Sequence, residues 1–131
     1  MLDFRHRRSY VGRRMASIRQ VLDALARRHG VQAVVALGAD GLPIEARGGD
    51  GVDSDGVAAL VPAIIRACDE FGGASRRGQF TSGVLEFGSG LAVVSVLERG
   101  TTLALLVAPD AEIGELLYDL KRYHTAIAAL F

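Results

Sequence analysis

The sequence contains one cysteine and three histidines among its 131 residues. A single cysteine excludes an internal disulfide and a zinc knuckle built on paired cysteines. No apolar run approaches the roughly 18 residues that a membrane-spanning helix needs, so we expect no membrane insertion. The basic N-terminus lacks the apolar core of a secretory signal peptide. We therefore expect a cytoplasmic protein.

The sequence also lacks a catalytic constellation. His6, His29 and His124 fall in a basic N-terminal stretch, at the end of a predicted helix and on the last predicted helix. Nothing in this spacing indicates a nucleophile, a base and an orienting acid that converge in space. Cys68 falls on the apolar stripe of a predicted helix, which favours a core side chain over a reactive thiol. We expect no catalytic residues.

Two loop patterns resemble ligand sites but lack the residues that such sites need. The glycine-rich residues 48–51 are not followed by the Lys-Ser/Thr pair of a phosphate loop. Aligning Asp53 and Asp55 with a calcium loop places Gly51 first and Pro62 last, where carboxylates are required. A flexible loop that caps the next helix is the better interpretation. We expect no cofactor and no metal ion.

Positive charge is concentrated in residues 1–14, although the formal net charge of the chain is zero. Five arginines against Asp3 give this segment +4, which leaves −4 for the remainder. Such an arm suits contact with nucleic acid or an anionic lipid surface. Sparse aromatic residues favour a solvated tail instead, and we expect no nucleic-acid partner. Phe4 and Tyr10 are available to fasten the arm to the domain.

Hydrophobic periodicity divides residues 15–131 into a helix, a hairpin, a helix, a three-stranded meander and a helix. Asp40-Gly41 between two β-type runs is a strong hairpin signal. Pro43 predicts an edge strand or a strand start, and Asp110 is a good N-cap for the last helix. The predicted helices cover residues 15–29, 53–73 and 111–131, and the predicted strands cover residues 32–37, 42–47, 79–87, 91–97 and 101–107.

The helix predicted over residues 53–73 is apolar on two sides. One stripe is typical of a core face: Val57, Leu60, Val61, Ile64, Cys68 and Phe71. A second stripe consists of small side chains, Ala59, Ala63 and Ala67. Pro62 conflicts with a helix interior, but the apolar period continues across it. Because a helix that is apolar nearly all round is buried on more than one side, we expect a partner to pack on the alanine stripe.

This order of elements resembles the Roadblock/dynein light-chain family over about residues 15–131. Short patterns are similar too: Gly30-Val31 before Val34-Val35-Ala36, the hairpin Asp40-Gly41-Leu42-Pro43-Ile44, and Ala111-Glu112-Ile113-Gly114 at the position of an Asn-Leu-Gly helix start. The resemblance implies an α+β fold, αββαβββα, with helices on the faces of a five-stranded antiparallel sheet. The basic arm 1–14, Pro62 and Glu112 in place of asparagine depart from the family pattern.

The resemblance implies a non-enzymatic module that forms a homodimer or heterodimer and regulates or scaffolds a small Ras-like GTPase, as bacterial relatives of the MglB kind do. It places the dimer interface on helix 54–71 and strand 79–87. The implied interface residues are Ala59, Ala63, Arg66, Ala67, Glu70, Phe80 and Ser82.

Arg76 and Arg77 precede this strand and are candidate partner contacts. One of them could serve as an arginine finger, although an ordinary solvated face explains them as well. The alternative function is a ligand-sensing module of the profilin or PAS-like type. That function needs a cavity with a few inward polar groups, and the Val, Leu, Ile and Ala of the predicted core give no sign of one.

Overall fold

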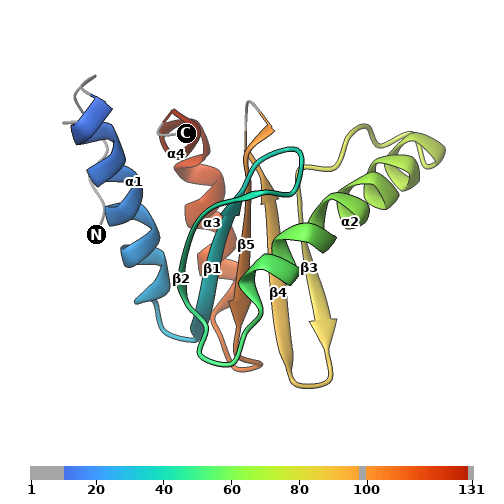
Figure 1. The fold of residues 1–131 in the computed structure, drawn as a ribbon. Helices are drawn as coiled ribbons and strands as arrows, with labels where there is room; N and C mark the ends of the chain where they lie inside the picture. The colour runs from blue at the N-terminus through green and yellow to red at the C-terminus, as the bar shows by residue number, and fades with distance from the viewer. Residues whose placement is uncertain (1–10, 98–99, 130–131) are drawn as a thin grey trace.

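The computed structural model describes residues 11–97 and 100–129. Within them, five strands form one antiparallel sheet with helices on both faces (Figure 1). This confirms the expected α+β fold and its order αββαβββα, to which a short final helix is added. The elements are α1 (Val11–Ala26), β1 (Val31–Leu37), β2 (Pro43–Gly48), α2 (Ser54–Ala74), β3 (Ser82–Phe87), β4 (Gly90–Val96), β5 (Thr102–Val107), α3 (Ile113–Arg122) and α4 (His124–Ala128).

The strands lie in the order β2-β1-β5-β4-β3, and each neighbouring pair is antiparallel. β1, β5 and β4 are interior strands, which explains their continuous apolar runs, because helices cover both of their faces. β2 is an edge strand and Pro43 is its first residue, as predicted from the missing N–H of proline. β3 forms the other edge.

Alternate residues of the interior strands belong to two separate cores. Val34, Val93 and Leu105 are paired neighbours on three strands and lie in the core that α1, α3 and α4 cover. Each of these residues has a chain neighbour that points to the opposite face of the sheet. These neighbours, Val35, Val94 and Ala104, lie in the core that α2 covers. The sheet therefore separates α2 from the other helices.

The expected bounds of the first helix, 15–29, are wrong at both ends. α1 begins at Val11 and ends at Ala26. Residues 27–30 form a turn, in which the N–H of Arg28 donates to the Leu25 carbonyl at 3.2 Å. The last four residues of the expected basic arm thus lie in α1, and residues 1–10 lie outside the described residues.

The single helix expected over residues 111–131 is also wrong, because it divides at Tyr123 into α3 and α4. Glu112, and not Asp110, is the N-cap residue of α3. A turn precedes it, in which the N–H of Ala111 donates to the Ala108 carbonyl at 3.1 Å. Residues 130 and 131 lie outside the described part of the chain. None of the described helices has the length and hydropathy to cross a bilayer.

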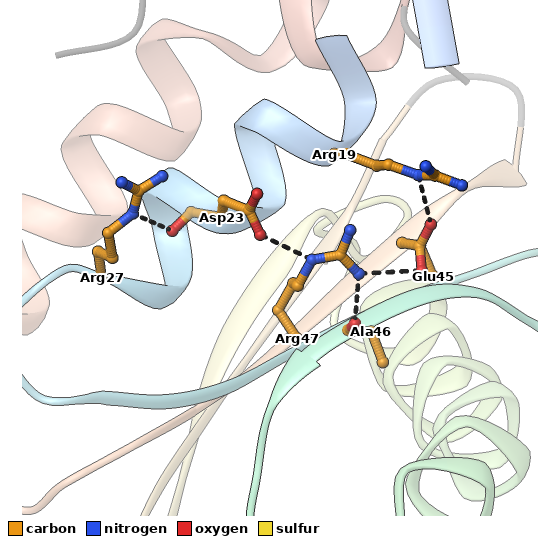
Figure 2. Close-up of polar contacts among 6 residues, drawn as sticks. All are labelled: Arg19, Asp23, Arg27, Glu45, Ala46 and Arg47. Carbon is orange, nitrogen blue, oxygen red and sulfur yellow. Dashed lines mark hydrogen bonds and ion pairs between the residues drawn. The ribbon is translucent and has the colours of Figure 1, made fainter. Parts of the chain in front are cut away.

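Arg47 of β2 connects the edge strand to α1 (Figure 2). Its Nε lies 2.7 Å from Asp23 Oδ1 of α1, and its Nη1 lies 2.9 Å from Glu45 Oε1. Arg19 of α1 approaches the other oxygen of Glu45 at 3.5 Å. The hydrogen bond from Arg47 lowers the pKa of the Glu45 carboxyl, and the same contact raises the pKa of Arg47. Ionised side chains therefore hold α1 against the β2 edge.

Helix α2 is continuous through Pro62. Asp53 caps its N-terminus, since Asp53 Oδ1 accepts a hydrogen bond from the N–H of Gly56 at 3.0 Å. Pro62 has no N–H to donate to the Ala58 carbonyl. Gly41 of the β1–β2 turn lies against this carbonyl and against the proline ring; its φ is +82° and a Cβ there would lie 3.3 Å from Ala58 O. The hairpin turn thus packs on the point where α2 lacks a hydrogen bond.

Candidate partner interface

Helix α2 has one flank that the described parts of the chain leave largely uncovered. Leu60 is 67% exposed and Phe71 is 73% exposed. Ala63 and Ala67 are exposed between them, and Ile64 is half-buried. The spacing of three and four residues places these side chains along one line of the helix surface. The flank is entirely apolar, and we call these five residues the α2 flank.

The positions of Leu60 and Phe71 correct the sequence-based expectation that both lie on the core stripe. The side chains of α2 that meet the sheet are centred on Val61, with Ala58 also buried. At about 100° of rotation per residue, Leu60 and Phe71 lie about 80–100° around the helix from Val61. This angle takes them off the sheet and into solvent.

The remaining helix residues of the predicted interface form an outward ridge next to the α2 flank. Ala59, Arg66 and Glu70 are all exposed and point away from the sheet. The ridge carries charge of both signs, whereas the α2 flank carries none. The structure therefore places all five predicted helix residues on an accessible surface, and their contact with a partner stays a prediction.

The edge strand β3 presents a second open surface. It pairs with β4 over Ser82–Phe87 and with no other strand in the described parts of the chain. Leu85 packs on the α2-side core. Phe87, on the same side of the strand, is 61% exposed. An unpaired edge with exposed apolar side chains is suited to pairing with another strand.

The turn between α2 and β3 fixes these two surfaces relative to each other. The backbone N–H of Phe80 donates to Asp69 Oδ1 at 2.8 Å, and the N–H of Arg77 donates to the Gly72 carbonyl at 2.7 Å. Gly72 is buried, and a Cβ at this position would overlap the carbonyl oxygen of Gly78. The chain is thus folded back along the last two turns of α2 before β3 begins.

This turn changes the place of Phe80, which was expected in a strand over residues 79–87. β3 begins at Ser82, so the expected strand start is wrong by three residues. The reason is that the Phe80 N–H bonds to Asp69 instead of to a strand. The Phe80 ring is half-buried and packs on the α2-side core. Ser82 is half-buried and is the first residue of the open edge.

Arg76 and Arg77 are both exposed at the tip of the same turn. Arg76 has a φ of +59°, a left-handed conformation that is uncommon for a residue with a side chain. The tight turn therefore holds two cations between the C-terminal end of α2 and the start of β3. Sequence inspection gave Asp69 no role, because its only signal was that it is one of the few charged residues on the helix.

The residues considered for chemistry do not assemble into a site. Cys68 is half-buried and is a free thiol. His29 lies in the turn after α1, whereas His124 begins α4. Across residues 11–97 and 100–129, no group of three or more His, Cys, Asp or Glu side chains is placed to hold a metal ion.

The family model of the Roadblock/LC7 domain matches residues 17–107, which include α2, β3 and the whole sheet. The chain belongs to the Roadblock/LC7 family. It is therefore an interaction module of the Roadblock type, whose family members are generally non-catalytic.

Solved structures agree with this fold. MglB of Myxococcus xanthus superposes with a TM-score of 0.77 at 16% identity over 87% of this chain and 86% of that one. An MglB structure with a tetrameric arrangement gives 0.79 at 17% identity over 89% of each chain. A Roadblock/LC7 domain from Streptomyces avermitilis gives 0.70 at 26% identity over 85% of this chain and 89% of that one. No curated protein sequence matches.

Proposed function

We propose that two copies of this chain associate through the α2 flank and the β3 edge, and that the dimer binds and regulates or scaffolds a small Ras-like GTPase. One observation carries this proposal. A fully apolar helix flank, which includes Leu60 and Phe71, stands uncovered beside an unpaired strand edge.

Burial of the α2 flank is favourable, and its small side chains allow a second helix to pack closely. Each large side chain that leaves water contributes about 1.5–3 kcal/mol. Ala63 and Ala67 lie between Leu60 and Phe71, so the backbone of a second helix can come close. A two-fold symmetric contact uses the same patch on both copies. It would bring the two α2 helices together and place the two β3 edges in position to pair.

The GTPase part of the proposal rests on the family. Roadblock proteins of the MglB kind regulate or scaffold small Ras-like GTPases, and the GTPase supplies the nucleotide chemistry. In this chain the exposed Arg76 and Arg77 lie in the turn that joins the two open surfaces. We infer that they contact the GTPase and act on its switch loops indirectly, because a non-enzymatic dimer needs no inserted catalytic residue.

Size-exclusion chromatography with light scattering tests the dimer. At micromolar concentration we expect twice the chain mass of 13.9 kDa. Ala63→Arg should weaken association by about 3 kcal/mol, because it buries an unpaired charge at the contact. Thr125→Arg, at an exposed position of α4, is the matched control and should leave the dimer intact. A wild-type chain that is purely monomeric would refute the dimer.

Affinity capture tests the GTPase. The tagged chain is incubated with extract of its source cell in GDP or in a non-hydrolysable GTP analogue. We expect the captured material to be enriched in a small GTPase in one of the two nucleotide states. Binding of the purified GTPase to the purified chain should confirm this result. Arg76→Ala combined with Arg77→Ala should reduce this enrichment without changing the dimer mass. A dimer that retains no small GTPase in either state would refute this part of the proposal alone.

A further inference from the structure

Helices α1, α3 and α4 lie on the face of the sheet opposite α2 (Figure 1). A groove of about 440 Å³ lies between α1 and the pair α3 and α4. Its floor consists of buried apolar side chains: Leu25, Leu116, Leu120 and Ile127. Arg28 in the turn after α1 pairs with Asp119 of α3 across it at 2.6 Å. The volume is within the usual range for binding sites.

The rim of this groove carries negative charge. Glu112 and Glu115 line it from the first turn of α3, and both are exposed. Neither carboxylate has an ion-pair partner in the described parts of the chain, whereas the nearby Asp119 is paired with Arg28. The groove therefore favours an occupant with apolar side chains for the floor and positive charge for the rim.

The segment that precedes α1 has this chemistry. Residues 1–10 contain Leu2, Phe4 and Tyr10 together with Arg5, Arg7 and Arg8, against one acidic residue, Asp3. The segment has a net charge of +2, and neither the dimer nor the GTPase contact uses it. Its apolar and basic residues are interleaved, as the floor and rim require.

The covalent connection allows the segment to reach the groove. Ala24 and Arg28 lie 13 and 17 residues after Val11, which is about 20–25 Å along a helix. Ten extended residues span about 33 Å, so the segment can fold back beside α1 and reach the groove. A short tether of this kind gives an effective concentration of about 1 mM. We propose that residues 1–10 bind in the groove between α1 and α3 of their own chain.

Disulfide trapping in the full chain tests this. In a Cys68→Ser background, Phe4→Cys is combined with Ala24→Cys in the groove, or with Asp55→Cys on α2 as control. Both partner positions are described surface sites on opposite faces of the sheet. With oxidised glutathione, the intrachain bond to position 24 should form about tenfold faster than the bond to position 55.

Charge reversal on the rim tests whether its two carboxylates attract the basic segment to the groove. Glu112→Lys with Glu115→Lys should slow the trapping at position 24 about threefold to tenfold. Asp55→Lys, which also removes an acid from the first turn of a helix, should change it by less than about twofold. Equal rates at positions 24 and 55 would overturn the proposal. So would a bond formed only between chains, or a small molecule that native mass spectrometry finds in the groove. None of these outcomes bears on the α2 interface.

Discussion

The carboxylate of Asp69 on α2 accepts a hydrogen bond from the backbone N–H of Phe80, 11 residues later, at 2.8 Å. This bond joins the exposed half of α2 to the segment that enters β3. Asp69 is half-buried, so the bond is partly shielded from water. It fixes the relation between the two surfaces that we assign to a partner.

The first prediction concerns this bond. Asp69→Ala leaves the Phe80 N–H without its acceptor and should lower the free energy of unfolding by about 1–3 kcal/mol. Asp69→Asn keeps an acceptor oxygen and should lose less than half of that. Urea denaturation at pH 7 measures both. Equal losses for the two variants would show that charge, and not the hydrogen bond, is what matters.

The second prediction compares two neighbouring glycines in the last turn of α2. Gly72→Ala should destabilise the fold by about 1–3 kcal/mol, because the new methyl group overlaps the Gly78 carbonyl. A Cβ at Gly73 meets nothing within 4 Å, so Gly73→Ala should be neutral or stabilising by up to about 1 kcal/mol. Thermal unfolding of both variants gives the comparison. If Gly72→Ala and Gly73→Ala had the same melting temperature, the close approach of residues 72 and 78 would be refuted.

The third prediction separates association from folding. Phe71→Ala should weaken the dimer by about 1.5–3 kcal/mol for each copy of the side chain, measured by sedimentation equilibrium. Because Phe71 is exposed in the single chain, the stability of the monomer should change by less than about 0.5 kcal/mol. Val61→Ala, at a buried position of the same helix, should instead cost about 1–3 kcal/mol of monomer stability. A Phe71→Ala dimer of unchanged affinity would place the interface elsewhere.

The fourth prediction concerns pH. Arg47 holds the pKa of Glu45 below its ordinary value of 4.5, so the folded state binds this proton less readily than the unfolded state does. The resulting stability is present above about pH 4.5 and is lost as the pH falls through the folded pKa. Its size should be below about 1 kcal/mol, since the pair is at the surface.

Glu45→Gln is the variant that isolates this contribution. The wild type should be more stable than Glu45→Gln at pH 7, and the difference should shrink in urea titrations between pH 4.5 and pH 3. Asp50→Asn, which removes an acid from the exposed loop after β2, is the matched control. A constant difference from pH 7 to pH 3 would contradict the assignment.

Local signals in the sequence were sufficient for the architecture. Asp40-Gly41 marked the hairpin, Pro43 marked the start of an edge strand, and the glycine-rich gaps marked the meander, because each signal depends on the backbone of a few residues. Helix ends were less predictable. α1 ended before Arg27, and the last helix divided at Tyr123, since turns held by backbone hydrogen bonds leave little trace in side-chain periodicity.

The candidate interface was predictable only in part. The alanine stripe of α2 indicated a second contact surface, but periodicity assigned Leu60 and Phe71 to the core. A sequence shows which residues share a helix face; it does not show how the helix is rotated on the sheet, which leaves Leu60 exposed beside the buried Val61, or where a long helix passes the sheet edge. In Figure 1 the C-terminal end of α2 extends past β3, so the last turns have no sheet beneath them. The Asp69 contact with Phe80 depends on that same geometry.

Gly72 has a further consequence for how this module could acquire new partners. The backbone at Gly72 leaves no room for even a methyl group, so the chain between α2 and β3 can follow only one path. The exposed part of α2 and the β3 edge therefore keep a constant orientation relative to each other. Selectivity among binding proteins must then come from exchange of surface side chains, such as those at positions 60, 66, 70 and 71. A change in the direction of the chain is not available without remaking the turn.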